Sequence, residues 1–99
     1  MNSKVYVVHD QGKINLLPAE EWGELVPCLT TSYSHVMVKR VYATLREAMR
    51  DITKQDFILP IGNPTYIAFA GAIMKDRTGV VRCLAWDGQL QKYYIQEVD

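Results

Sequence analysis

His9 and Asp10 are the first residues whose side chains could carry chemistry, because an imidazole beside a carboxylate can act as a base with its orienting acid. They directly follow the β-branched and aromatic run of residues 4–8, which predicts that they lie at the end of a strand. Adjacent strand residues point to opposite faces of a sheet. The pattern therefore favours a strand-end histidine beside a turn aspartate over an acid–base pair.

The sequence Gly62-Asn63-Pro64 is the second candidate site, because it predicts a tight turn followed by the start of a helix. Free N–H groups at a helix start can hold phosphate or carboxylate. Turn and cap chemistry explains the same residues without a ligand, and neither glycine-rich nucleotide motif is present. With both explanations open, the candidate ligand-binding residues are His9, Asp10, Gly62, Asn63 and Thr65.

No pattern in the chain predicts catalysis, a metal site or a cofactor. Cys28 and Cys83 lie in separate apolar segments, and together with the two histidines they do not form a zinc-ligand spacing. Ser32 and Ser34 lack the flanking glycines of a nucleophile elbow. We therefore expect no catalytic residues, no bound metal and no cofactor, and we interpret both cysteines as inert core thiols.

Three cations in the segment after residue 38 form a candidate basic flank. At about 100° per residue, Lys39, Arg46 and Arg50 fall on one side of a helix, while Glu47 and Asp51 fall further round. Such a flank can grip phosphates or an acidic partner, but a solvated helix face with its stems packed along the core boundary is the favoured explanation. The chain has 11 Lys and Arg against 11 Asp and Glu, so no overall field attracts nucleic acid. Nucleic-acid binding is therefore an alternative that the composition does not favour.

Tyr93, Tyr94 and Ile95 are candidate interface residues in the last predicted strand. The two tyrosines are adjacent, so one should pack on the core and the other should be free to contact a partner. The strand carries only Lys92 and Glu97 as charges, too few to block an exposed sheet edge. We expect a protein partner or a second copy to pair with it, and a symmetric homodimer is the simplest solution.

Hydrophobic spacing and turn residues predict the elements that position these side chains. Apolar runs predict strands at residues 4–8, 24–29, 57–61, 80–86 and 90–98, and Asp87-Gly88 predicts a hairpin between the last two. Helical spacing predicts one helix from Val38 to about residue 53, and caps predict another from Pro64 to Gly79. Residues 18–22 predict one or two helical turns. Residues 14–17 predict either a short strand or an extended connection.

This order of elements contains two β-α-β crossovers, which leave their strands parallel. We predict a single α/β domain over residues 1–99, with a mostly parallel sheet of four or five strands, two main helices and a C-terminal hairpin. Pro27 cannot donate to a ladder, which indicates that its strand lies at an edge of the sheet or begins there. A two-layer α+β sandwich is the alternative if residues 14–17 pair with the first strand. In the parallel arrangement His9 and Gly62 meet at the carboxyl edge, where such sheets bind ligands.

Three stretches of the chain carry a resemblance to a known group: residues 4–9 (KVYVVH), residues 59–64 (LPIGNP) with the helix after them, and residues 79–94. In these stretches the chain resembles small proteins encoded by tailed bacteriophages and prophages. The resemblance implies a viral or mobile-element origin and no catalytic residues.

These features predict a non-enzymatic binding protein that acts by contact with a host or viral macromolecule. Two alternatives stay open, an α/β protein that binds a small ligand or nucleotide at the Gly62 turn and a nucleic-acid-binding module. The longest apolar run, residues 66–74, is much shorter than the ~20 residues of a spanning helix. Since no signal peptide is visible either, we expect the host cytoplasm and no membrane partner.

Overall fold

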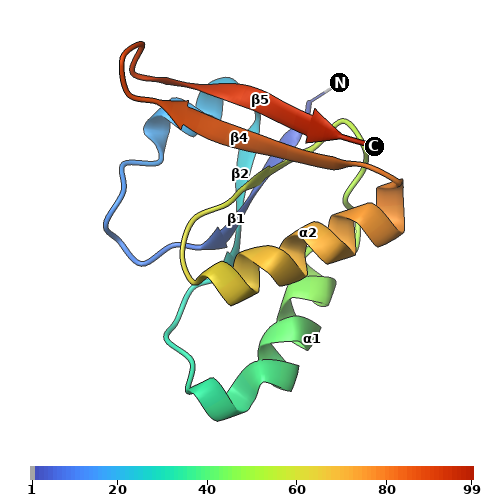
Figure 1. Cartoon of the computed structure of the whole chain (residues 1–99). Helices are drawn as coiled ribbons and strands as arrows, with labels where there is room; N and C mark the ends of the chain where they lie inside the picture. The colour runs from blue at the N-terminus through green and yellow to red at the C-terminus, as the bar shows by residue number, and fades with distance from the viewer. Residues whose placement is uncertain (1) are drawn as a thin grey trace.

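Figure 1 shows a computed structural model of the chain, which describes residues 2–99 apart from the side chain of His35. Its centre is a five-stranded sheet in the order β2-β1-β3-β4-β5. The strands are β1 (Lys4–His9), β2 (Glu24–Leu29), β3 (Phe57–Leu59), β4 (Val81–Asp87) and β5 (Lys92–Val98). Neighbouring strands are parallel except β4 and β5, which form an antiparallel hairpin. The predicted α/β fold is confirmed, and Pro27 lies in an edge strand as expected.

The alternative α+β sandwich is not formed, because both sides of β1 are occupied by parallel strands. Residues 14–17 instead lead into a 3-10 helix, η1 (Leu17–Glu21), which confirms the helical turns expected near residue 18. The side chain of Asn15 accepts a hydrogen bond from the backbone N–H of Leu17 at 3.1 Å. The carbonyl of Leu16 accepts another from Ala19 at 2.9 Å. These bonds turn the chain away from an extended path.

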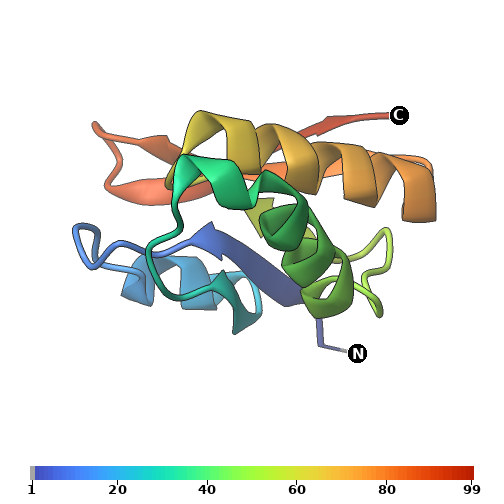
Figure 2. The same ribbon diagram turned by 90° about the horizontal axis from the view of Figure 1, so that it is seen from below.

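The two main helices, α1 (Val38–Ala48) and α2 (Pro64–Thr78), lie side by side on one face of the sheet (Figures 1 and 2), and a 3-10 turn, η2 (His35–Met37), precedes α1. The connection from β1 leads to β2 at one edge of the sheet. The later two crossovers, from β2 to β3 and from β3 to β4, run toward the other edge. Right-handed crossovers in opposite directions must cover opposite faces. Accordingly η1 packs on the face away from the helices. The connections after β1 and β3 therefore leave the sheet on different sides, which makes their carboxyl ends a topological switch point.

Both faces of the interior strand β1 are buried, as its run of β-branched and aromatic residues predicts. Tyr6 and Val8 face the two helices, where they join a cluster that includes Leu45 and Ile73. Val5 and Val7 face the other way and join a second cluster with η1, β3, β4 and β5. The helix layer covers one face well, whereas a single 3-10 turn and its flanking loops cover the other.

α2 begins and ends where the sequence predicts. The side chain of Asn63 accepts a hydrogen bond from the backbone N–H of Thr65 at 2.8 Å, and Pro64 is the first helical residue. At the other end Gly79 adopts the left-handed conformation with φ of 85°, and its N–H bonds the carbonyl of Lys75 at 2.9 Å. Local cap chemistry alone thus accounts for both boundaries.

α1 ends at Ala48, about one turn before the predicted end near residue 53. Met49 and Ile52 are still buried as the helical spacing predicts, but the chain has left the α-helix. The N–H of Arg50 bonds the carbonyl of Glu47 at 3.3 Å, and that of Ile52 bonds Met49 at 3.1 Å, both three residues back. Asp56 accepts hydrogen bonds from the backbone N–H groups of Thr53 at 2.8 Å and Lys4 at 2.9 Å. Asp56 thereby anchors this turn to the start of β1.

The C-terminal hairpin is confirmed, although its loop is longer than the Asp87-Gly88 signal suggests. Asp87 pairs with Lys92, so residues 88–91 form the loop and β5 starts two residues after the predicted Leu90. The carboxylate of Asp87 accepts from the N–H groups of Gln89 at 2.9 Å and Leu90 at 3.1 Å. Gln91, rather than Gly88, adopts a positive φ of 55°. The side chain of Asp87 therefore organises the turn.

Candidate functional site

The carboxyl edge of the sheet brings His9 and Gly62 together, as the parallel arrangement requires. A Cβ atom at position 62 would lie 2.5 Å from the Cβ of His9 and 2.6 Å from its carbonyl oxygen. Gly62 also has a φ of +102°, which side chains rarely adopt. Glycine at this position is therefore required by the close approach of the chain to β1, whether or not a ligand binds.

A polar hollow of about 490 Å³ opens beside His9 at this edge. It is lined by His9, Asp10, Gln11, Lys13, Thr30, Thr31 and Ser32. Gly62 lines a smaller neighbouring hollow of about 80 Å³. Neither lining includes Asn63 or Thr65, which form the cap of α2. Of the five predicted ligand residues, the structure thus groups three at the hollows and leaves two in a structural role.

His9 is 6% exposed, and only one of its two ring nitrogens has a hydrogen-bond partner among the described residues. Nε2 lies 2.9 Å from the carbonyl oxygen of Thr31, so this nitrogen carries the proton and donates it. Nδ1 is buried and has no hydrogen-bond partner among the described residues. The ring packs 5.5 Å from the ring of Tyr66, measured between centroids. The adjacent Asp10 instead accepts from the N–H of Gly12 at 2.8 Å, so the two residues do not form an acid–base pair.

The predicted basic flank is largely neutralised by its own neighbours. The guanidinium of Arg50 forms ion pairs with Glu47 and, at 3.7 Å, with Asp51. Arg50 itself lies beyond the end of α1 at Ala48, where its side chain reaches the carboxylate three residues before it and the one that follows it. The guanidinium of Arg46 lies 5.8 Å from the centroid of the Tyr42 ring. Of the three predicted cations, only the exposed Lys39 shows neither kind of contact in the described part of the chain.

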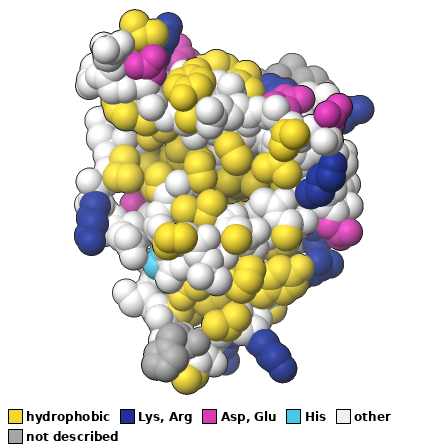
Figure 3. Space-filling view, viewed as in Figure 1, with side chains coloured by type: hydrophobic (Ala, Val, Ile, Leu, Met, Phe, Trp, Pro, Cys, Tyr) yellow, Lys and Arg dark blue, Asp and Glu magenta, His cyan; other side chains and the backbone are white. Residues whose placement is uncertain are grey.

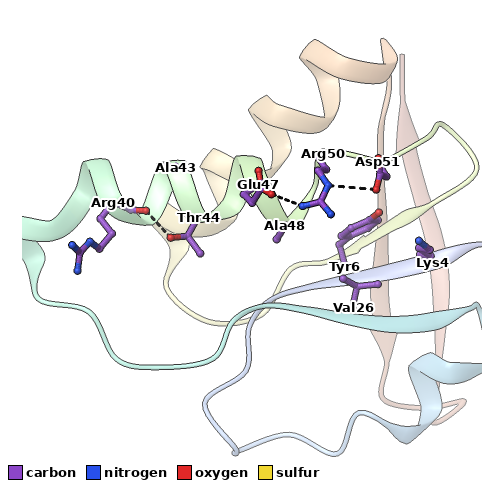
Figure 4. A pocket seen from close by; sticks show the side chains of 10 residues that line it. All are labelled: Lys4, Tyr6, Val26, Arg40, Ala43, Thr44, Glu47, Ala48, Arg50 and Asp51. Carbon is purple, nitrogen blue, oxygen red and sulfur yellow. Dashed lines mark hydrogen bonds and ion pairs between the residues drawn. The ribbon is translucent and has the colours of Figure 1, made fainter.

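A groove of about 600 Å³ between α1 and β2 was not predicted from the sequence (Figure 4). It is lined by Lys4, Tyr6, Val26, Arg40, Ala43, Thr44, Glu47, Ala48, Arg50 and Asp51. The small side chains of Ala43, Thr44 and Ala48 line the α1 side of this space. The combination of small residues along one helix side with a proline-containing edge strand is the sequence signal that could have indicated it.

The groove has a neutral floor. Tyr6 is 2% exposed, and burial, reinforced by the nearby carboxylates of Asp56 and Asp51, raises the pKa of its phenol to about 12. The hydroxyl of Thr44 donates to the carbonyl of Arg40 at 2.8 Å, so it is already satisfied within the helix. The charges of the groove therefore lie on its rim.

The predicted interface residues of β5 divide between core and surface. Tyr93 is 5% exposed and packs against Trp86 with 4.9 Å between ring centroids, while Tyr94 is 44% and Ile95 38% exposed. One tyrosine is thus buried and the other free, as expected. Figure 3 shows hydrophobic side chains gathered on the side of the molecule that carries β4, β5 and α2. The large exposed apolar residues of the hairpin are Trp86, Leu90, Tyr94, Ile95 and Val98.

Residues that could bind metal or react as nucleophiles are not grouped in the described part of the chain. No three His, Cys, Asp or Glu residues among those described come close enough to hold a metal ion. Burial raises the pKa of the Cys28 thiol to about 12 and also raises that of Cys83. Both thiols are therefore poor nucleophiles at neutral pH. Within residues 2–99, neither helix combines the length and the hydropathy needed to cross a bilayer.

Comparison with known proteins supports the resemblance to phage proteins. A family model described as Phage Pam3 gp32-like protein matches residues 3–99, nearly the whole chain. Searches of curated proteins and of solved structures found no match. On the strength of this match, the chain belongs to the Phage Pam3 gp32-like protein family.

Proposed function

We propose that this phage-family protein is a non-enzymatic binding protein that acts by contact with a host or viral macromolecule. We further propose that β5 forms one of its interfaces, by pairing with β5 of a second copy. The main support is the outer edge of β5. This strand is the last in the sheet, and six of its seven residues are exposed.

The two edges of the sheet differ in how well they are blocked. An edge strand presents unpaired backbone groups that can accept another strand, and proteins blunt such edges with proline, charges or bulges. β2 contains Pro27, whereas β5 contains no proline and has only Lys92 and Glu97 as charges. Glu97 is already paired with Arg82 at 3.3 Å. The β5 edge is therefore the more suitable one for a strand partner.

A two-fold pairing centred on Ile95 would use the whole of β5. In this antiparallel register Lys92 faces Val98 of the second copy, Tyr93 faces Glu97, and Tyr94 faces Gln96. No like charges stand opposite each other, and the two copies of Ile95 meet at the axis. Self-complementarity of this kind is what a two-fold interface requires.

Sedimentation at micromolar concentration tests the paired form. The wild type should sediment at twice the 11.3 kDa mass of the chain. Ile95→Lys would place two lysines opposite each other and should sediment as a monomer, whereas Leu17→Lys, at a 68% exposed site on η1, should remain dimeric. A monomeric wild type, or an Ile95→Lys variant that stays dimeric, would overturn the β5 interface.

A small-ligand function at the carboxyl edge is the second candidate, favoured by the polar hollow beside the buried, unpartnered Nδ1 of His9. Ligand binding would raise the melting temperature through mass action. We expect such a rise with millimolar phosphate or ADP if this candidate holds, and Lys13→Ala, at the exposed rim, should reduce it. Lys13 is preferred to Gly62 because any side chain at position 62 would disturb the fold.

A nucleic-acid-binding role, the third possibility, has less support. The Arg50 guanidinium is engaged by Glu47 and Asp51, which leaves a weaker positive surface than the sequence suggests. The balanced charge of the chain supplies no compensating field.

A further inference from the structure

We propose that the groove between α1 and β2 binds an extended peptide segment of a partner protein, with apolar residues flanked by acidic ones. This site extends the proposed binding function to a second surface on the opposite edge of the sheet from β5. Three features support it: the shape of the groove, the free edge beside it and the distribution of charge along it.

The shape of the groove suits side chains of moderate size. Ala43, Thr44 and Ala48 form the helical wall, and Val26 with the ring of Tyr6 forms the floor (Figure 4). The volume of about 600 Å³ is enough for several side chains. Because the Thr44 hydroxyl bonds within α1, the wall offers mainly methyl groups to a ligand. The interior therefore favours apolar side chains.

The free edge of β2 adjoins this groove. β2 is the outermost strand, so its outer backbone groups have no strand neighbour in the described chain. A groove between a helix and an edge strand is the arrangement in which extended peptides add a strand to a sheet. Proline is tolerated in strands where its nitrogen faces away from the ladder, so the backbone nitrogen of Pro27 should face away from β1. Backbone groups two residues apart face the same side, so the N–H and carbonyl of Leu25 should face outward as well. Leu25 can then offer both its N–H and its carbonyl to an added strand.

The charges of the rim favour an acidic ligand. The three cations Lys4, Arg40 and Arg50 outnumber the two carboxylates Glu47 and Asp51. Both carboxylates pair with Arg50, while Arg40 and Lys4 have no ion-pair partner among the described residues. Figure 4 shows Arg40 at one end of the groove and Lys4 at the other. An extended segment with a carboxylate near each end and apolar residues between them matches this pattern.

The same features argue against a nucleic acid in the groove. Single-stranded nucleic acids need exposed aromatic rings for stacking and a continuous positive track. The one aromatic side chain of the lining, Tyr6, is 2% exposed, and Glu47 and Asp51 interrupt the cations. A peptide is therefore the better fit.

Selection from a random peptide library on the wild-type protein tests this site. We expect enrichment of peptides in which apolar residues are flanked by Asp or Glu. Ala43→Glu would fill the groove and repel carboxylates, and it should weaken binding of a selected peptide by about tenfold or more, or ~1.4 kcal/mol. Ala68→Glu is the matched control, because Ala68 is also an exposed helical alanine but lies in α2, outside the groove. It should bind the peptide as the wild type does.

Two further measurements separate strand addition from other modes of binding. Hydrogen exchange at the N–H of Leu25 should slow in the presence of the selected peptide, and Ile95→Lys should bind it normally, so failure of the β5 interface would leave this result intact. Library selection without enrichment, equal binding by Ala43→Glu, or unchanged exchange at Leu25 would each overturn the proposal. Displacement of the peptide by a single-stranded DNA oligonucleotide would likewise contradict it and point to nucleic acid.

Discussion

Gly62 lies directly against His9, with no room for a side chain between the β3–α2 connection and the end of β1. A Cβ atom at position 62 would come within 2.6 Å of the carbonyl oxygen of His9, and the φ of +102° adds backbone strain for any other residue. Gly62→Ala should therefore lower the free energy of unfolding by about 2–4 kcal/mol. Urea unfolding measures this loss.

Gly71 supplies the matched control for this prediction. It lies within α2, and a Cβ added there would meet no atom within 4 Å. Gly71→Ala should raise the free energy of unfolding by about 0.5–1 kcal/mol, because alanine loses less conformational freedom in a helix. Equal effects of the two substitutions would show that close packing at position 62 is not the cause.

Leu45 is the central contact of α1 with the sheet, and it is fully buried. Leu45→Ala should lower the free energy of unfolding by about 2–5 kcal/mol through lost burial and the cavity left behind. Leu17→Ala, at a site that is 68% exposed, should change it by less than ~0.5 kcal/mol. Thermal and urea unfolding of both variants check the assignment, and a small loss at Leu45 would mean that α1 packs on the sheet in another way.

Helix faces could be predicted more reliably than the depth of each residue within the core. The nearly continuous apolar sequence of α2 suggests that Ile67 is a core residue, yet it is only half-buried, while Ala70, Ile73 and Met74 are fully buried. A helix that is apolar all round has no polar face to set its rotation. Its packing on β1, β4 and α1 sets it instead. This information is tertiary and is absent from the local pattern.

Element boundaries could be predicted where one residue determines them. Asn63 and Gly79 mark the ends of α2 through their own side chain and backbone, and Pro27 marks the edge strand. The end of α1 has no such residue. The guanidinium of Arg77 in α2 donates there to the carbonyls of Arg46 and Arg50 at 3.4 Å, and Asp56 joins the following turn to the N–H of Lys4, 52 residues away. The groove beside α1 was missed for the same reason, since it forms only when β2 lies beneath Ala43 and Ala48.

Alkaline pH should destabilise the fold through Tyr6 and Cys28. Burial raises the pKa of Tyr6 from its ordinary value of 10.0 to about 12, and that of Cys28 from 9.0 to about 12. The folded state therefore holds more protons than the unfolded state above pH 9.0, so stability falls as pH rises. Below about pH 8, one unit under the lower of the two ordinary pKa values, both groups are protonated in both states and contribute no pH dependence.

Replacement of the Cys28 thiol measures its contribution to the loss of stability at alkaline pH. Cys28→Val keeps an apolar side chain in β2 and should reduce the loss of stability above about pH 9. The contribution of Cys83, whose pKa burial also raises, and that of Tyr6, which begins near pH 10, should remain. Urea unfolding between about pH 8 and pH 11 measures the onset. A wild-type stability that stays constant across this range would contradict the assignment of both groups as buried and neutral.

Substitutions at Arg82 compare two contacts of β4, one with the ring of Phe57 in β3 and one with the carboxylate of Glu97 in β5. Its guanidinium carbon lies 4.3 Å from the centroid of Phe57, and its side chain lies 3.3 Å from the carboxylate of Glu97. The ion pair is partly exposed, with 24% and 43% of the two side chains accessible, so Glu97→Gln should cost less than ~0.5 kcal/mol. Arg82→Met keeps the apolar stem but loses the charge over the ring, and it should cost about 1–2 kcal/mol. In the double variant the two losses of unfolding free energy should nearly add, because most of the effect of Arg82 comes from its contact with Phe57. If Glu97→Gln instead cost as much as Arg82→Met, the ion pair would be the main contact.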